Sequence, residues 1–240
     1  MIALIVLPTY NEKPNIERVA AGILAHDFTR LLVVDDGSPD GTGEIADGIA
    51  ARSNGRVEVM HRRGKRGLGL AYVDGLRHAL TTGADAIVQM DADLSHDPKY
   101  LPDLLARLEQ YDLVIGSRYL HGVSVVNWPL HRIALSAFAN RYIRAVTGLT
   151  PTDCTSGFRM WRRDALARLP LDGLRANGYA FLTEMLYEAA RHGCRIGESP
   201  IVFVERLEGY SKVSQSVLME SLLTPWRLIA RGGRLAPPKA

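Results

Sequence analysis

Short apolar runs alternate with helical patterns along the first half of the chain. The runs are bounded by turn residues and lie at 2–7 (IALIVL), 30–36 (RLLVVDD), 57–61 (VEVMH), 85–91 (DAIVQMD) and 112–117 (DLVIGS). Between them, apolar residues recur at helical intervals in 15–26, 41–51, 68–80 and 98–109. Strands without a polar face are typical of a mostly parallel sheet that helices cover on both sides. The pattern therefore predicts an α/β fold with a doubly wound, mostly parallel sheet.

Beyond about residue 120 the pattern changes to longer helical stretches, notably 130–146 and 217–230, and one late strand at 196–205. Charged residues interrupt both helical stretches, so neither provides the roughly 20 consecutive apolar residues of a bilayer span, and no transmembrane helix is expected. We expect a single domain over residues 1–230. The last ten residues, 231–240, are rich in Gly, Pro and basic residues and predict a flexible tail.

Composition excludes several classes of protein. The chain has 240 residues, of which 47% are hydrophobic, and this is enough for a sizeable core. The formal net charge of +3 is too small to indicate nucleic acid as a partner. The cysteines, Cys154 and Cys194, have neither metal-ligand nor disulfide spacing, which favours a reducing compartment. The first run ends at Pro8 and predicts a strand instead of a signal peptide, so we expect a cytoplasmic protein.

The segment VQMDADLSHDP places two carboxylates at the end of a predicted strand. In an extended chain Asp91 and Asp93 point to the same side, where a divalent cation would relieve their repulsion. Mg²⁺ and Mn²⁺ prefer oxygen ligands of this kind. The simpler alternative is that one aspartate caps the next helix and the other is solvated. The acid pair of a glycosidase is another alternative, but its carboxylates lie about 5–10 Å apart on opposite sides of the scissile bond.

Ligands of open α/β sheets bind beyond the carboxyl ends of the strands, and acidic residues recur there in this chain. The loop DDGSPDGT follows the second run, and its carboxylates could accept hydrogen bonds from a nucleotide. A plain turn capped by Asp40 and Thr42 is the alternative. The basic run at 62–66 has neither Walker nor GxGxxG spacing, so it predicts a solvated loop before a helix.

The motifs PTYNE, DDGSPDGT and MDADLSHDP occur in the order and approximate spacing of the family 2 glycosyltransferases, which the chain resembles over its first 120 residues. Further along, IGSRY, NWPLHRIALSAFAN, TDCTSGFRMW and VERLEGYSK resemble the dolichol-phosphate mannose synthases, a type of polyprenyl-phosphate mannosyltransferase. Together the motifs cover most of residues 3–215. The resemblance implies the GT-A nucleotide-sugar-binding fold, with residues 1–120 binding the donor and 121–230 the acceptor.

The resemblance also implies GDP-mannose as donor, a polyprenyl phosphate as acceptor and Mg²⁺ or Mn²⁺ as cofactor. The implied nucleotide ligands are Pro8, Tyr10, Glu12 and Asp36. The implied metal ligands are Asp91 and Asp93, with Ala92 beside them at the diphosphate. The implied phosphate-binding cations are Arg118, Arg206 and Lys212. Some family members carry Gln where this chain has Ser95, so Ser95 is left out of the expected metal shell.

The helix expected over 130–146 has two distinct stripes. The polar stripe recurs every fourth residue and comprises Arg132, Ser136 and Asn140. The apolar stripe comprises Leu135, Phe138, Tyr142 and Val146. We expect Arg118 and Arg132 to bind the acceptor phosphate, with Ser136 donating a hydrogen bond. The apolar stripe could lie in lipid headgroups, or the helix could pack on the domain with its arginines in water.

A lipid phosphate is already anionic and can attack the sugar without a general base, so His96, His121 and His131 are interpreted as ordinary polar residues. The loop 208–212 is expected to close over the donor. The segment SGFRMW at 156–161 could line the sugar pocket or pack structurally. The resulting hypothesis is an inverting mannosyltransferase at the cytoplasmic face of a membrane, with a membrane protein as a possible partner. The alternatives are a lipid-phosphate transferase with another donor, such as a glucose nucleotide, or a catalytically silent nucleotide- or lipid-binding scaffold.

Overall fold

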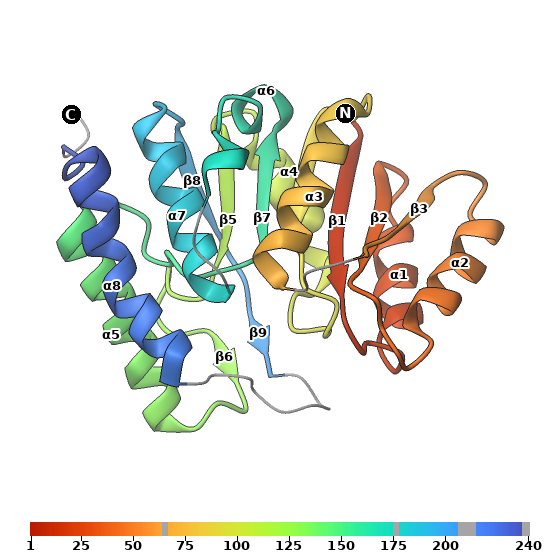
Figure 1. Cartoon of the computed structure of the whole chain (residues 1–240), viewed down its shortest axis with the longest axis horizontal. Helices are drawn as coiled ribbons and strands as arrows, with labels where there is room; N and C mark the ends of the chain where they lie inside the picture. Colours follow the sequence, from red (N-terminus) through yellow and green to blue (C-terminus); the bar gives the residue numbers. More distant parts are fainter. Residues whose placement is uncertain (64–66, 175–177, 206–214, 237–240) are drawn as a thin grey trace.

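The computed structural model describes residues 1–63, 67–174, 178–205 and 215–236, without the side chains of 178–179 and 215–218. Over these residues the chain forms a central sheet in the order β3-β2-β1-β4-β7-β5-β8 (Figure 1). The strands are β1 (Ala3–Thr9), β2 (Thr29–Asp35), β3 (Val57–His61), β4 (Ala86–Gln89), β5 (Leu113–Ser117), β7 (Arg159–Arg162) and β8 (Ile196–Pro200). Only β7 runs antiparallel to its neighbours within this sheet. The predicted mostly parallel α/β fold is confirmed.

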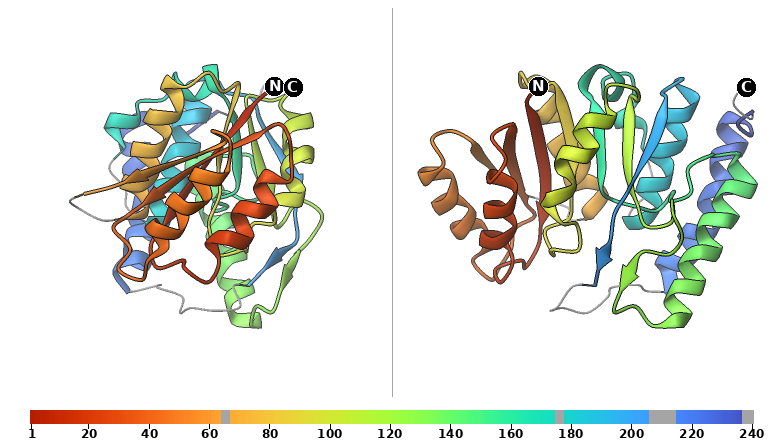
Figure 2. Two further views of the ribbon diagram at one scale, coloured as in Figure 1. Left: turned by 90° about the vertical axis from the view of Figure 1, so that its right-hand side faces the viewer. Right: turned by 180° about the vertical axis from the view of Figure 1, so that it is seen from behind.

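Helices cover both faces of the sheet (Figure 2). The helices described are α1 (Ile16–Leu24), α2 (Thr42–Arg52), α3 (Leu68–Thr81), α4 (Leu101–Arg107), α5 (Leu130–Thr147), α6 (Arg163–Leu166), α7 (Gly178–Arg191) and α8 (Gln215–Gly232), with short 3₁₀ turns at Pro98–Tyr100 and Leu171–Gly173. In β1, Leu4 and Val6 belong to the core on one face, whereas Ile5 and Leu7 belong to the core on the other. Because alternate residues point to opposite faces, a two-sided core requires the continuous apolar runs seen in the sequence.

The segment SGFRMW contains a strand that the sequence did not reveal. Its last residues form β7, which lies between β4 and β5 in the middle of the sheet. Met160 and Trp161 are fully buried, and the Trp161 indole donates to Gln89 Oε1 at 2.9 Å. A strand of four residues that begins and ends with arginine is too short to show a strand period, so the pattern carried no signal. The structural interpretation of this segment is therefore correct for residues 159–161, which belong to β7.

The single late strand expected over 196–205 is wrong, because the structure has two short strands there. The first, β8, pairs with β5 as far as Pro200 opposite Ser117, where β5 ends. The Ile201 backbone N–H still donates to the Ser117 carbonyl at 3.0 Å, and the chain then leaves the central sheet. It forms β9 (Phe203–Val204), which pairs with β6 (Val125–Val126) in a separate two-stranded sheet.

Helix α8 packs against α7 and α5 and extends further than expected. Arg231 forms an ion pair with the buried carboxylate of Glu184, and the Leu235 backbone N–H donates to the Thr147 carbonyl at 2.9 Å. Leu235 packs against the core, and residues 237–240 of the expected flexible tail lie outside the described residues. Among the helices described, none is both long and apolar enough to cross a bilayer.

Candidate active site

A cavity of about 450 Å³ lies beyond the carboxyl ends of β4 and β5. The loop after β4 contributes Asp91, Asp93 and His96, and the residue after β5 contributes Arg118. Helices α5, α7 and α8 and strand β9 complete the wall, and α5 and α8 lie side by side at the β8 edge of the sheet (Figure 1). The cavity therefore joins residues from both halves of the chain.

Asp91 and Asp93 both line this cavity and are held by neighbouring hydroxyl groups. Tyr72 donates its hydroxyl to Asp91 Oδ1 at 2.9 Å, and Ser95 donates its hydroxyl to Asp93 Oδ1 at 2.5 Å. The pKa of Tyr72 is raised by burial and by the Asp91 charge, which keeps the phenol a donor. The following helical turn is capped by Asp97 instead, which accepts from the Lys99 backbone N–H at 3.0 Å. Neither Asp91 nor Asp93 is thus a cap of that turn.

The aspartate pair fits a divalent ion that is shared with an anionic ligand. The Asp91 side chain is 34% exposed, so its carboxylate is reachable. Within the described part of the chain, no cluster of three or more His, Cys, Asp and Glu residues encloses a metal position. Mg²⁺ is commonly bound by one or two carboxylates and completed by water and substrate phosphates. Because the Ser95 hydroxyl donates to Asp93, its role in the structure is to orient that carboxylate.

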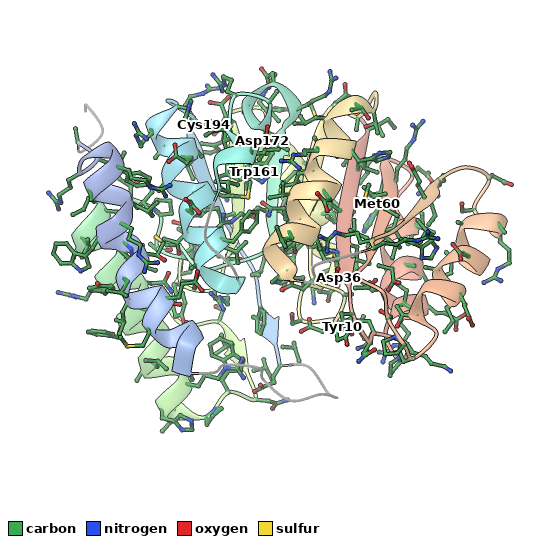
Figure 3. All side chains as sticks on the ribbon, in the orientation of Figure 1. Tyr10, Asp36, Met60, Trp161, Asp172 and Cys194 are labelled. Atoms are coloured by element: carbon green, nitrogen blue, oxygen red, sulfur yellow. The ribbon has the colours of Figure 1, made fainter. Side chains whose placement is uncertain are left out.

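The residues expected to bind the nucleotide lie at the carboxyl ends of β1 and β2, where Tyr10 and Asp36 are labelled in Figure 3. Pro8, Tyr10, Glu12 and Asp36 do not line the 450 Å³ cavity, whereas Asp91 and Asp93 do. Buried Ala92 packs in the core between the two aspartates of its motif. The predicted donor residues therefore occupy two neighbouring regions of the same sheet edge.

The Asp36 carboxylate is anchored at both oxygens. Arg62 forms an ion pair with Oδ1, and the Gly67 backbone N–H donates to Oδ2 at 2.8 Å. Arg62 also donates to Asp74 at 2.7 Å. The sequence analysis placed Arg62 in a solvated basic loop, and this is wrong for Arg62, whose side chain is only 11% exposed and pairs with two carboxylates. Glu12 has a local role as well, since Asn15 Nδ2 donates to its carboxylate at 2.9 Å.

Arg118 is bound tightly to a carboxylate that the sequence analysis did not single out. Its Nε and Nη2 donate to the two carboxylate oxygens of Asp153, each at 2.7 Å, and its backbone N–H donates to Oδ2 at 3.0 Å. Asp153 is fully buried. Burial opposes its ionisation, but the charge and hydrogen bonds of Arg118 outweigh burial and lower the pKa of Asp153. The only signal in the sequence was the place of Asp153 inside the motif TDCTSGFRMW.

Of the polar stripe on α5, Arg132 and Ser136 line the cavity, whereas Asn140 is buried and accepts from the Cys154 backbone N–H at 2.7 Å. Arg132 pairs with Glu205 and lies over the Trp128 ring, with its Cζ 4.2 Å from the ring centroid. The Arg118 Cζ is 5.6 Å from the same centroid. The structure therefore brings the two expected acceptor-phosphate cations to one indole ring. Arg206, Lys212 and the loop 208–212 lie outside the described residues.

Many of the exposed large apolar residues lie on α5 and α8, the helices that also line the cavity, and on the segments around β6 and β9. We call them the apolar collar: Val123, Val126, Leu130, Leu135, Phe138, Val202, Val204, Met219, Leu222, Leu223 and Trp226. Leu135, Phe138 and Leu222 also line the cavity. The predicted apolar stripe of α5 is thus turned outward at Leu135 and Phe138, whereas Arg132 turns inward to Glu205. Further along the helix, Arg141 and Arg144 are exposed, while Tyr142 and Val146 of the stripe are half-buried, as the alternative of a packed helix predicts.

Comparison with known proteins gives a sequence family and full-length relatives, including the following two. Residues 4–169 match the model described as glycosyl transferase family 2. The chain is 44% identical over 234 residues, 96% of either chain, to the undecaprenyl-phosphate mannosyltransferase of Micrococcus luteus. It is 42% identical over 221 residues, 91% of this chain and 83% of the relative, to the polyprenol monophosphomannose synthase of Mycolicibacterium smegmatis.

Among solved structures, the chain is similar to glucosyl-3-phosphoglycerate synthase from Mycobacterium tuberculosis in complex with Mn²⁺, UDP and glucosyl-3-phosphoglycerate. The TM-score is 0.68 at 23% identity, and the match covers 100% of this chain and 81% of that one. A second structure of that enzyme, in complex with Mn²⁺, UDP and phosphoglyceric acid, has the same TM-score at 22% identity. These likenesses confirm the predicted GT-A fold.

Proposed function

The chain belongs to glycosyl transferase family 2 and is a glycosyltransferase, and on that premise we propose that it transfers mannose from GDP-mannose to a polyprenyl phosphate, with inversion. The names of the Micrococcus and Mycolicibacterium relatives support mannose as the sugar and a polyprenyl phosphate as the acceptor. The observation that carries the proposal is the cavity itself. It joins the predicted metal ligands Asp91 and Asp93 to the predicted acceptor residues Arg118, Arg132 and Ser136.

In this proposal residues 1–120 supply the donor side and residues 121–230 the acceptor side of the site. Asp91 and Asp93 would hold Mg²⁺ or Mn²⁺, and the Mn²⁺ and UDP in the Mycobacterium tuberculosis enzyme are consistent with such an ion. When bound, the ion neutralises negative charge that develops on the leaving diphosphate. Tyr72 and Ser95 keep the two carboxylates turned toward the cavity through their hydroxyl groups.

Arg118 and Arg132 would bind the acceptor phosphate from the opposite wall. Each guanidinium is already oriented by a carboxylate, Arg118 by Asp153 and Arg132 by Glu205. Planar guanidinium groups match phosphate oxygens in geometry and charge. An oxygen of the lipid phosphate attacks the anomeric carbon, the bond from that carbon to the diphosphate breaks, and GDP leaves. Since the attacking oxygen is already anionic, no side chain has to remove a proton, and a single displacement inverts the configuration.

The polyprenyl chain would leave the cavity between α5 and α8, across the apolar collar. The cavity wall is apolar there, with Leu135, Phe138 and Leu222, and the same residues continue onto the exposed surface. Contiguous exposed apolar patches mark membrane or protein contacts. We therefore propose that the protein binds peripherally at the cytoplasmic face of a membrane, with or without a membrane-protein partner.

The test is a transfer assay with purified protein, labelled GDP-mannose, Mg²⁺ or Mn²⁺, and polyprenyl phosphates of several lengths. We expect a labelled lipid whose mannose is β-linked, and no label in the lipid fraction when Asp93→Ala replaces the wild type. Parallel reactions with UDP-glucose and other nucleotide sugars identify the donor. Transfer from another donor but not from GDP-mannose would replace the donor assignment, and an α-linked product would contradict the single displacement.

A further inference from the structure

His96 lies in the cavity between the aspartate pair and the acceptor arginines. It belongs to the same loop as Asp91, and both side chains line the cavity together with Arg118. The residue is only 2% exposed. Its ring stacks on Phe158, with centroids 5.1 Å apart, and meets Phe203 edge-on at 5.7 Å. Contacts on the face and on the edge of the ring hold the imidazole in one orientation.

The hydrogen bonds of His96 assign its proton. Its Nδ1 accepts a hydrogen bond from the Asp91 backbone N–H at 3.0 Å. A ring nitrogen that accepts a hydrogen bond carries no proton, so the proton of this imidazole is on Nε2. In the described part of the chain, Nε2 has no hydrogen-bond partner. A rigid N–H donor at the wall of a cavity that also contains guanidinium groups is suited to an anionic ligand.

The surrounding rings connect His96 to the acceptor side of the cavity. Phe203 contacts not only His96 but also Arg118, whose Cζ is 5.5 Å from the Phe203 centroid. Trp128 meets Phe203 at 5.4 Å and carries Arg132 on its face. His96, Arg118 and Arg132 therefore belong to one contiguous cluster built around two aromatic rings. A phosphate that contacts the arginines lies within the same cluster as the His96 ring.

We propose that His96 is a phosphate-binding residue whose Nε2–H donates a hydrogen bond to the acceptor lipid phosphate. The ring would place that phosphate next to the loop that carries Asp91 and Asp93. This inference rests on the proposed function and deepens it. It replaces the interpretation of His96 as an ordinary polar residue, because the sequence could reveal neither its orientation nor its neighbours.

Two substitutions of His96 test the roles of its two ring nitrogens one at a time. In His96→Asn the amide oxygen occupies roughly the position of Nδ1 and can still accept from the Asp91 N–H, but the Nε2 donor is lost. In His96→Gln the amide nitrogen reaches roughly the position of Nε2, while the acceptor for the Asp91 N–H is lost. His121→Asn is the matched control, because His121 is exposed and does not line the cavity. Thermal unfolding of each variant reports whether the fold is retained.

For His96→Asn we expect the KM for polyprenyl phosphate to rise about 10- to 100-fold, the usual effect of losing a hydrogen bond to a charged group. Binding of GDP in the presence of Mg²⁺, measured by calorimetry, should stay near that of the wild type. His96→Gln should recover much of the lipid affinity, and its GDP binding should weaken because the Asp91 loop is less firmly held. His121→Asn should match the wild type in every measurement.

The proposal is overturned if His96→Asn keeps the wild-type KM for the lipid, or if His96→Asn and His96→Gln lose lipid affinity equally. A purely structural role predicts the second result. If His96→Asn weakens only GDP binding, the hydrogen bond goes to the donor diphosphate, and the assignment to the acceptor is wrong. These results are informative only where the wild type transfers mannose, so inactive wild-type protein would refute the proposed function instead.

Discussion

The Arg118–Asp153 pair should make a large contribution to stability, and Asp153→Asn tests it. Both groups are buried, with Arg118 7% and Asp153 0% exposed. The substitution keeps the shape of the side chain but places an amide against a guanidinium and leaves its charge uncompensated. Breaking a buried ion pair by removing one partner costs about 3–5 kcal/mol. Against a folding free energy of about 5–15 kcal/mol, this is a substantial part of the total.

The free energy of unfolding is measured by urea denaturation followed by circular dichroism. Its dependence on urea concentration, the m-value, should be the same in the variant and the wild type. Asp172→Asn is the matched control, because Asp172 also pairs with an arginine, Arg77, but its side chain is 86% exposed. An exposed pair contributes about 0–1 kcal/mol. The double variant Asp153→Asn with Arg118→Gln should lose less than the sum of its single substitutions, because neither charge then stays buried alone. Equal losses for Asp153→Asn and Asp172→Asn would refute the reasoning.

The same pair predicts a pH dependence of stability. The folded protein holds the pKa of Asp153 below its ordinary value of 3.8, because the Arg118 charge and hydrogen bonds outweigh burial. A carboxyl group with a lowered folded pKa stabilises the protein above its unfolded pKa, and this stabilisation is lost as the pH falls through the folded pKa. Between about pH 5 and pH 2 the wild type should therefore lose stability more steeply than Asp153→Asn. Parallel curves over that range would contradict the assignment.

Three further predictions concern the divalent metal, the tyrosine that holds one of its expected ligands, and binding to the membrane. Removing divalent ions with a chelator should abolish mannose transfer, and full activity after chelation would exclude a role for the metal. At saturating metal, Asp93→Ala should lower kcat by at least about a hundredfold. Tyr72→Phe removes the hydroxyl that donates to Asp91 and should weaken the affinity for Mn²⁺ about tenfold or more. The affinity is measured by electron paramagnetic resonance of Mn²⁺ in the presence of GDP. An unchanged affinity would mean that Tyr72 only contributes to packing. Phe138 is 60% exposed, and Phe138→Asp should reduce binding of the protein to anionic vesicles about tenfold or more. The control Ala51→Asp, on α2, should leave vesicle binding unchanged. Equal binding by the two variants would place the membrane contact elsewhere.

Much of the fold could be predicted from the sequence, because its signals are local. The apolar runs of β1, β2, β4 and β5 are continuous, since both faces of the sheet are buried there, whereas β3 at the sheet edge exposes Glu58 and His61. The position of Asp91 and Asp93 beyond a strand end follows from the same pattern. The family followed from several ordered motifs, each only a few residues long. None of these conclusions required knowing which distant segments meet.

Only the tertiary structure decided which side chains pair across the site. Asp153 lies 35 residues from Arg118, and Glu205 lies 73 residues from Arg132, so no local period links either pair. The insertion of β7 between β4 and β5 was equally hidden, because an antiparallel strand of four residues leaves no periodic pattern. The orientation of His96 depends on Phe158 and Phe203, which come from two other parts of the chain. Residue types and strand ends are local properties, whereas the direction and charge environment of a side chain depend on packing between segments that are distant in sequence.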